Sequence, residues 1–128
     1  MQRIPRTVGV SLAMALSLTF FLSGCGPEPI DVTCNQSVED LQATQKSQEN
    51  LYVVRCPANC SDGSLWGTDV YTTDSSICTA ARHAGLMGQE GGEAEIEILP
   101  GRKSYEGSMR NGVRTGDWPE YKSSFTVR

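Results

Sequence analysis

The sequence predicts an α+β domain with one α-helix among several short antiparallel strands and with two disulfides. Apolar residues recur at helical spacing over residues 75–84, where Ile77, Ala81 and Ala84 share one face. In contrast, "EAEIEIL" (93–99) alternates between apolar and acidic residues, which is typical of a half-buried antiparallel strand. The third observation is an even set of four cysteines that follows an export-like N-terminus.

The N-terminus has the features of a secretory signal. Arg3 and Arg6 make a short basic start, and an apolar run follows from Val8 to Leu22. Its 15 residues are fewer than the roughly 20 that an α-helix needs to span a bilayer. Directly afterwards "LSGC" ends at Cys25 and the chain turns to "GPEP", without a basic stop-transfer flank. We therefore expect residues 1–24 to be a signal peptide and expect no permanent transmembrane anchor.

The stretch "LSGC" at positions 22–25 resembles the lipobox of bacterial lipoproteins, in which the cysteine is acylated and becomes the new N-terminus. This resemblance implies that Cys25 carries acyl chains, palmitate among them, and that residues 25–33 form a lipidated N-terminus and a short tether. An ordinary signal peptide is the alternative. Gly26 follows the cysteine in place of the aspartate linked to inner-membrane retention, so the outer membrane is the expected address if the cell has one.

Composition limits the partners of the mature chain. Removing Arg3 and Arg6 from the 11 basic residues leaves 9 against 15 acidic ones, a net charge of −6 over 104 residues. That length corresponds to one domain. The acidic balance and the lack of a basic run argue against nucleic acid, and no cofactor motif is apparent.

The first predicted strands lie in the first half of the mature chain. "LYVVRC" (51–56) is rich in aromatic and β-branched residues and is followed by turn formers. "LWGTDVY" (65–71) is a second candidate, interrupted by Gly67. The polar segment 35–50 is expected to be a loop or a weak helix.

End signals define the predicted helix. Asp74 or Ser75 can cap its N-terminus, and Gly85 can adopt the left-handed conformation after its last turn. Its stripe of small residues requires neighbouring backbone to approach closely, since voids would otherwise remain.

The C-terminal part reads as further short strands. "YEGSM" (105–109) is a candidate strand, and Asn111–Gly112 is a pair favoured in tight hairpin turns. The closing "SSFTVR" (123–128) alternates Phe125 and Val127.

The remaining cysteines admit more than one chemistry. Cys34, Cys56, Cys60 and Cys78 are expected to form two disulfides after export, and spacing alone leaves all three pairings open. The last three, with His83, also have the ligand types of a zinc site, and Cys78 with His83 could form a thiol–histidine pair. Oxidation competes with both alternatives in an exported chain, so we expect no metal site.

Five stretches, in this order and spacing, resemble the successive motifs of the LCCL domain family: "VVRCPANC" (53–60), "WGTDVYTTDSSICTAARHAGLM" (66–87), "GG" (91–92), "PGRKSYEGSMRNGV" (100–113) and "SSFTV" (123–127). The polar segment between Cys34 and Cys56 does not match in detail. The resemblance places the domain at residues 30–128.

The resemblance carries expectations about fold and chemistry. It implies a central helix wrapped by antiparallel strands, with Cys34 paired to Cys56 and Cys60 paired to Cys78. It also implies a non-catalytic module, because LCCL domains are known from secreted proteins, some linked to host defence and to binding lipopolysaccharide. His83 then loses its thiol partner and is expected to be a structural residue near the helix C-terminus, where the helix dipole favours a protonated ring.

The function expected is that of a lipid-anchored binding or adhesion module of the cell envelope, with a polysaccharide, a lipid headgroup or an envelope protein as ligand. The aromatic residues Trp66, Tyr71, Tyr105 and Trp118 are interleaved with basic ones, and the candidate ligand contacts are Arg102, Lys103, Tyr105, Arg110 and Arg114. Two alternatives are a structural envelope lipoprotein with no discrete small ligand and a small hydrolase using carboxylates such as Asp69 and Asp74. Packing in the core and a solvated surface are the simpler explanations of the aromatic and basic residues.

Overall fold

The computed structural model describes residue 9 and residues 28–128, and the rest of the N-terminal segment lies outside this range. The predicted signal peptide, the lipobox and Cys25 therefore fall outside the described residues. Within the described part, no helix is both long and apolar enough to cross a membrane.

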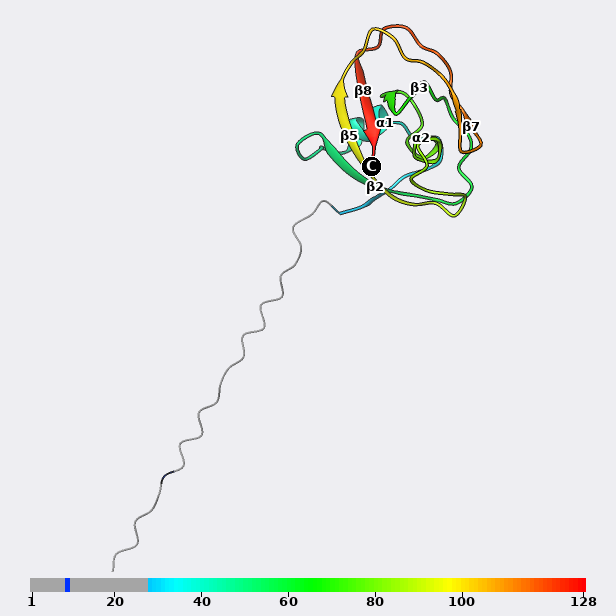
Figure 1. The fold of residues 1–128 in the computed structure, drawn as a ribbon. Helices are drawn as coiled ribbons and strands as arrows, with labels where there is room; N and C mark the ends of the chain where they lie inside the picture. The colour runs from blue at the N-terminus through cyan, green and yellow to red at the C-terminus, as the bar shows by residue number, and fades with distance from the viewer. Residues whose placement is uncertain (1–8, 10–27) are drawn as a thin grey trace, which may run out of the picture.

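Short strands and two short helices make up the domain (Figure 1). A mixed sheet has the strand order β1-β2-β5-β8-β4-β3, in which β1 pairs parallel to β2 and the other pairs are antiparallel. A hairpin of β6 and β7 stands apart. The bounds in chain order are β1 Ile30–Asp31, α1 Val38–Thr44, β2 Leu51–Cys56, β3 Gly67–Thr68, β4 Val70–Thr72, α2 Ile77–His83, β5 Gly92–Pro100, β6 Met109–Arg110, β7 Val113–Arg114 and β8 Ser123–Val127. The predicted α+β class is confirmed.

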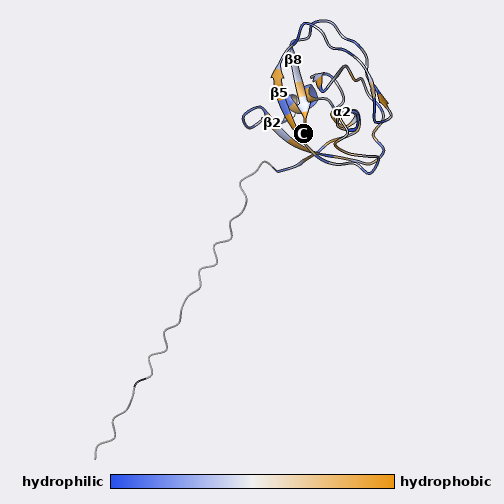
Figure 2. Ribbon diagram, viewed as in Figure 1, coloured by the Kyte–Doolittle hydropathy of each residue, from blue (hydrophilic) through white to orange (hydrophobic). Residues whose placement is uncertain are grey.

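The core lies between the sheet and the helices. Alternate residues of β2 and β5 point inward: Tyr52 faces Ile96, and Val54 faces Ala94 across the ladder. Phe125 of β8 is also fully buried. Figure 2 shows hydrophobic residues along β5 and β8. The period of two seen in "EAEIEIL" thus places apolar side chains inside and glutamates outside.

The predicted central helix is confirmed, with a different N-terminal cap. Ser76 is the N-cap residue of α2, and its side chain makes no capping bond. Asp74 and Ser75 are engaged elsewhere: Asp74 accepts a hydrogen bond from the Thr72 hydroxyl, and Ser75 Oγ accepts one from the Trp66 amide at 3.0 Å. Neither predicted residue caps the helix, because both side chains form hydrogen bonds to the preceding strand and loop instead.

The C-terminal end of α2 follows the prediction. Gly85 adopts a φ of 79°, and its amide donates to the Arg82 carbonyl at 3.0 Å. Because Ala80 and Ala81 are fully buried, the small-residue stripe does face the core, as the sequence indicated.

Two segments differ in detail from the predicted elements. The polar segment after Cys34 contains α1, closed by a capping box in which Ser37 and Asp40 exchange hydrogen bonds. The "LWGTDVY" stretch is two strands, and the break falls at Asp69 (φ 64°) between β3 and β4.

The hairpin turn at Asn111–Gly112 is confirmed, with φ values of 51° and 76°. Of the predicted strand 105–109, only the two ends pair: Tyr105 forms an isolated bridge to Trp118, and Met109 begins β6 and pairs with Arg114. Between them, the Gly107 and Ser108 amides donate to the side chains of Asp117 and Thr115 instead of to a neighbouring strand.

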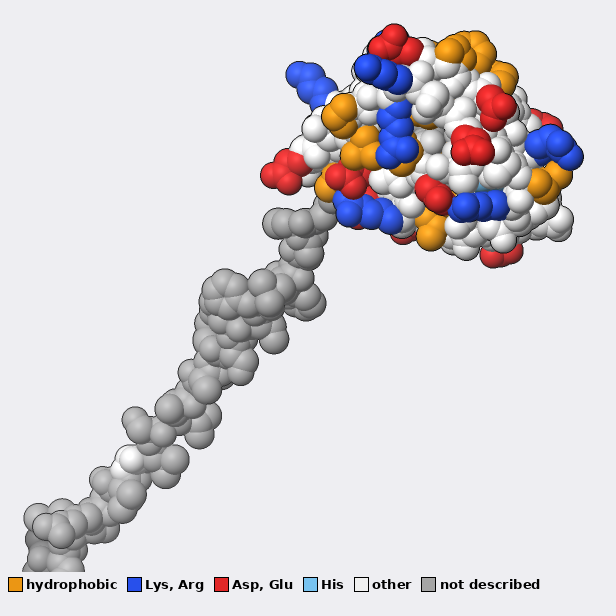
Figure 3. Space-filling view, turned by 45° about the horizontal axis from the view of Figure 1, so that its top comes forward, with side chains coloured by type: hydrophobic (Ala, Val, Ile, Leu, Met, Phe, Trp, Pro, Cys, Tyr) orange, Lys and Arg blue, Asp and Glu red, His pale blue; other side chains and the backbone are white. Residues whose placement is uncertain are grey.

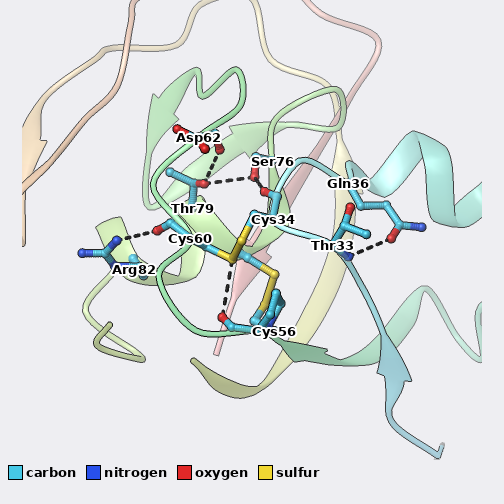
Figure 4. Close-up of a disulfide and its surroundings, with 11 residues drawn as sticks. Thr33, Cys34, Gln36, Cys56, Cys60, Asp62, Ser76, Thr79 and Arg82 are labelled. Carbon is cyan, nitrogen blue, oxygen red and sulfur yellow. Dashed lines mark hydrogen bonds between the residues drawn. A yellow bond between two sulfur atoms is a disulfide. The ribbon is translucent and has the colours of Figure 1, made fainter. Parts of the chain in front are cut away.

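The implied disulfide pairing is wrong. Cys34 bonds to Cys60 and Cys56 bonds to Cys78. Figure 4 shows the disulfide between Cys34 and Cys60 with the labelled residues around it. Strand alternation gives the reason: Cys56 points inward with Val54 and so meets the buried first turn of α2, where its Cα lies 5.6 Å from that of Cys78. The Cα atoms of Cys34 and Cys60 lie 4.9 Å apart, because the loops before α1 and after β2 pass each other there. The sequence correctly predicted that the four cysteines form two disulfides, but both implied pairings were wrong.

Candidate functional site

The five residues predicted to contact a ligand occupy three places. Arg102 and Lys103 are exposed at an open groove of about 510 Å³. Arg110 and Arg114 lie on the β6–β7 hairpin, and Tyr105 is buried. We call the first of these the 101–122 groove; it is lined by Gly101, Arg102, Lys103, Glu120, Tyr121 and Lys122. The tertiary structure thus groups Arg102 and Lys103 at this groove, and Arg102 also lines a second cavity together with Tyr105.

Two loop segments meet at the floor of the 101–122 groove. The Tyr121 amide donates to the Arg102 carbonyl at 3.1 Å. The backbones approach so closely that a Cβ atom on Gly101 would lie 2.1 Å from the Tyr121 carbonyl oxygen. Any larger residue at position 101 would push the segments apart, so the floor is set by backbone contact.

Tyr105 supports the groove from within the domain. Its hydroxyl accepts a hydrogen bond from the Arg102 amide at 3.0 Å and bonds to the Ser124 hydroxyl of β8 at 2.6 Å. The side chain is only 5% exposed. Its observed contacts therefore fix the Arg102 backbone on the sheet.

Glu39 of α1 neutralises one side of the groove. Its Oε1 atom accepts a hydrogen bond from the Tyr121 hydroxyl at 2.8 Å and lies 3.0 Å from Lys122 Nζ. Partial burial alone would raise the pKa of Glu39, but the hydrogen bonds from Tyr121 and Lys122 outweigh it and lower that pKa. Burial and the bond to Glu39 raise the pKa of Tyr121. Tyr121 and Lys122 are thereby held in place as wall residues.

The other two cations of the groove have no such partner. Neither Arg102 nor Lys103 forms a salt bridge within residues 28–128. On the outer face of the sheet the arginines are paired: Arg55 contacts Asp31 and Glu93, and Arg128 contacts Glu95 and Glu97. Figure 3 shows acidic and basic side chains mixed over one face of the domain. The groove thus carries two cations, Arg102 and Lys103, that have no ion-pair partner among residues 28–128.

The hairpin arginines lie in a different setting. Arg110 Nη1 lies 2.8 Å from Asp69 Oδ1 at the β3–β4 turn, while Arg114 is exposed. Between them, Asn111 Nδ2 donates to the His83 carbonyl at 2.8 Å. The hairpin is therefore tied to the C-terminal end of α2, and its contacts there are structural.

His83 is fully buried in a hydrogen-bonded network. Its Nδ1 atom lies 2.8 Å from the Tyr71 hydroxyl, and its Nε2 atom lies 3.1 Å from the Ser108 hydroxyl. Burial lowers the pKa of His83 and raises that of Tyr71 to about 12. The expected structural role of His83 is confirmed. Burial thus opposes the protonated form that the helix dipole was expected to favour.

The disulfides occupy the cysteine sulfurs that the alternative zinc site and thiol–histidine pair would need. Cys56, Cys60 and Cys78 are all bonded to other cysteines, so the sulfurs that a zinc site or a thiol–histidine pair requires are occupied. Of the carboxylates considered for a hydrolase, Asp69 pairs with Arg110 and Asp74 accepts from Thr72. Each performs a local structural task.

The aromatic residues that alternate with basic ones in the sequence lie in different environments in the fold. Tyr71 is fully buried between His83 and Phe125. Trp66 and Trp118 are half-buried and pack on each other, with ring centroids 4.8 Å apart. Core packing accounts for Tyr71, and the two tryptophans pack on each other at the surface.

Sequence reasoning missed three residues of the groove environment: Glu39, Tyr121 and Lys122. Glu39 and Tyr121 are 82 positions apart in the sequence, so only the tertiary structure reveals their contact. The "EYKS" stretch carried no periodicity, but its charge and its place before the last strand could have drawn attention to it.

The comparisons with known proteins agree with this architecture. The family model described as LCCL domain matches residues 32–125. Human vitrin is 40% identical over 78 residues, covering 59% of this chain and 12% of vitrin. Mouse cochlin is 34% identical over 127 residues, covering 98% of this chain and 22% of cochlin.

A third relative, human cysteine-rich secretory protein LCCL domain-containing 2, is 37% identical over 91 residues, covering 66% of this chain and 18% of that protein. The chain thus spans less than a quarter of the length of these relatives. The family match, which covers most of the described domain, shows that the chain belongs to the LCCL domain family.

Proposed function

We propose that this LCCL chain is a non-catalytic binding module of the cell envelope, anchored through acyl chains on Cys25, which holds an anionic ligand at the 101–122 groove. The export-like N-terminus and the two disulfides support a location outside the cytoplasm. One relative is itself named a secretory protein. The outer membrane is the proposed address if the cell has one.

The observation that carries this proposal is the pair of unneutralised cations at a fixed groove. The backbone of Arg102 is held by two hydrogen bonds. Its carbonyl accepts one from the Tyr121 amide, and its amide donates one to the Tyr105 hydroxyl. The guanidinium remains exposed beside Lys103. A planar guanidinium suits carboxylate, sulfate or phosphate oxygens, and charge-assisted bonds are the stronger class of hydrogen bond. A preorganised backbone also lowers the ordering cost of binding.

A non-catalytic role fits the contacts of the polar groups that could otherwise perform chemistry. The single histidine is enclosed by Tyr71 and Ser108, and the cysteines are bonded in pairs. A binding role requires only charge and shape, which the 101–122 groove offers.

A binding screen with matched substitutions tests the proposal. The purified full chain is titrated with acidic and neutral polysaccharides and with vesicles of anionic or neutral lipid. Arg102→Ser is compared with Arg114→Ser, and Lys103→Ser with Lys46→Ser, so that each groove cation has a control of the same type on another surface. We expect the groove substitutions to weaken binding roughly tenfold each, since a hydrogen bond to a charged group is worth about 1.5–3 kcal/mol.

The outcomes separate the function classes. Equal losses in Arg102→Ser and Arg114→Ser would mean that the 101–122 groove is not the site. Failure of the intact chain to bind any of the probes would favour a structural envelope lipoprotein. Mass spectrometry of the N-terminus, with Cys25→Ser as control, tests the anchor separately: an unacylated chain that begins after an ordinary cleavage site would remove that part of the proposal.

A further inference from the structure

Charges of both signs line the 101–122 groove. Arg102 and Lys103 form no ion pair among residues 28–128, and neither does the exposed carboxylate of Glu120. The hydrogen bond from the Tyr121 amide to the Arg102 carbonyl joins the two segments that carry these charges. A ligand with only negative charge would attract the cations but would be repelled by Glu120, whereas a ligand that carries both charges can pair with all three side chains.

The other two side chains of the groove are already engaged. Glu39 Oε1 lies 3.0 Å from Lys122 Nζ and accepts the hydrogen bond of the Tyr121 hydroxyl. Lys122 Nζ also lies 5.9 Å from the centroid of the Tyr121 ring, which is the one aromatic ring that lines the groove. A quaternary ammonium is recognised on open aromatic faces, and this ring already has a cation over it. A primary ammonium instead donates hydrogen bonds to a carboxylate, which Glu120 offers.

The groove and the entry of the chain lie at the same end of the sheet. β1 runs parallel to β2 with Ile30 beside Val54, so the residues before Ile30 lie level with the start of β2. β2 in turn pairs antiparallel to β5, and Tyr52 faces Ile96. The entering residues are therefore level with the second half of β5, which ends directly before Gly101.

The distance from the entry to the groove is short. Glu28 lines a shallow cavity together with Tyr52 and the loop before β2, in agreement with the register. Five residues along β5 and two strand spacings separate this level from Gly101, which is about 20 Å at about 3.3 Å per residue and about 4.8 Å per strand. From Cys25 to Glu28 the chain reaches at most about 10 Å, since an extended residue spans about 3.5 Å. A bilayer that holds acyl chains on Cys25 is thus accessible to the groove.

We infer that the ligand of the groove is a phosphoethanolamine headgroup of the anchoring bilayer, with its phosphate at Arg102 and Lys103 and its ammonium at Glu120. In ethanolamine lipids a two-carbon link joins the phosphate to a primary ammonium, and arginine and lysine both suit phosphate oxygens. The inference rests on the proposed function, since it uses the anchor on Cys25 and the binding role of the groove. It names the anionic group of the ligand as a phosphate that carries its own cation.

The test uses the acylated full chain reconstituted into vesicles, with acylation verified by mass spectrometry of the N-terminus. The vesicles consist of phosphatidylcholine alone or of phosphatidylcholine mixed equally with phosphatidylethanolamine or phosphatidylglycerol. Phenylglyoxal modifies accessible guanidinium groups, so its rate of reaction reports whether Arg102 is covered. Mass spectrometry of peptides compares that rate with the rate at Arg114, which is exposed on the β6–β7 hairpin of the same molecule and is the internal control.

We expect phosphatidylethanolamine to slow the modification of Arg102 severalfold relative to Arg114, compared with vesicles of phosphatidylcholine alone. Because acyl chains hold the domain on the bilayer, the headgroup is present at a high effective concentration and can occupy a weak site. Phosphatidylglycerol should protect Arg102 less, since it lacks the ammonium. Glu120→Gln should remove the difference between these two lipids, while Glu49→Gln, at an exposed carboxylate outside the groove, should preserve it.

Other results would overturn the inference in separable ways. Equal protection by phosphatidylglycerol and phosphatidylethanolamine in the native chain would overturn the ammonium contact at Glu120 while the proposed function stands. If soluble glycerophosphoethanolamine protects Arg102 but phosphatidylethanolamine vesicles do not, the anchoring bilayer is not the source. If an acidic polysaccharide protects Arg102 and no headgroup does, the ligand class is wrong. If no anionic probe of any kind binds, the proposed function itself fails.

Discussion

Polar side chains around α2 differ from those at the 101–122 groove in their burial and in their hydrogen bonding. Around α2, polar side chains are buried and matched: His83 bonds to Tyr71 and Ser108, and Thr79 donates to the Asp62 carbonyl at 2.6 Å. No buried side-chain nitrogen or oxygen among the described residues lacks a partner. At the groove, the backbone is equally well fixed, but Arg102 and Lys103 extend into solvent without a carboxylate.

This difference separates residues that stabilise the fold from residues available to a ligand. A buried polar group left without a partner costs about 1–3 kcal/mol, so the matched groups around α2 are needed for stability. Exposed cations contribute little to stability. Substitutions near α2 should therefore unfold the domain, whereas substitutions at the groove should change binding.

The largest effect is expected from the disulfide that ends in α2. Replacing Cys56 and Cys78 together by alanine should lower the free energy of unfolding by about 2–5 kcal/mol, measured by urea denaturation. The pair Cys34→Ala with Cys60→Ala should cost less, because Cys34 is only half-buried while Cys78 is fully buried. The two closed loops are of similar size, with separations of 22 and 26 residues, so burial should decide the difference.

The same variants check the pairing. Apart from Cys25, neither double variant above should contain a thiol that reacts with an alkylating reagent in the denatured state. Replacing Cys34 and Cys56 together should instead expose the thiols of Cys60 and Cys78. A disulfide in that last variant, with free thiols in the first two, would restore the pairing implied by the family resemblance.

A smaller loss is expected from His83. His83→Gln should destabilise the domain by roughly 1–3 kcal/mol, because Tyr71 and Ser108 lose a buried partner. Burial lowers the folded-state pKa of His83, so its contribution is complete above the unfolded value near 6.5 and is lost as pH falls below it, while only the unfolded chain takes up the proton. Asp69 and Arg110 also face the ring and partly offset each other.

The chain has one histidine, so the pH dependence can be assigned. Between pH 6.5 and about 5, the intact protein should lose stability while His83→Gln stays level, measured by urea denaturation at each pH. If the free energy of unfolding changed with pH in the same way in both proteins, His83 would have the same pKa in the folded and unfolded states.

A loss of stability together with a loss of binding is expected at the groove floor. Gly101→Ala places a Cβ against the Tyr121 carbonyl and should cost about 1–3 kcal/mol while separating the two segments. Ser104→Ala, in the same loop and exposed, is the control. Binding of acidic polymer should fall only in Gly101→Ala; unchanged binding there would show that the groove geometry does not matter.

Much of the fold could be predicted because it depends on local patterns. The strand 51–56 is confirmed at the same bounds, the "EAEIEIL" alternation marks β5, and Asn111–Gly112 forms its turn. Each depends on backbone preferences and on a single buried face. The caps of α2 were predicted less well, since Asp74 and Ser75 were free to bond to Thr72 and Trp66 instead.

The candidate site could be predicted only in part. The basic residues from 102 to 114 formed one cluster along the chain, but the loop carries Arg102 and Lys103 to one place and the hairpin carries Arg110 to Asp69. The contact of Glu39 with Tyr121 and Lys122 joins distant segments, and no spacing rule signals it.

The sequence by itself determined the family, the central helix, the alternating strands and the number of disulfides, because these follow from residue order and periodicity. Only the tertiary structure decided which cysteines pair, in which direction the pKa of His83 shifts and which cations stay without an ion-pair partner. Those outcomes depend on distances between segments far apart in the chain and on burial. Cys56 meets Cys78 because the inward face of β2 lies on α2, and Arg102 stays unpaired because no described carboxylate lies within ion-pair distance of it.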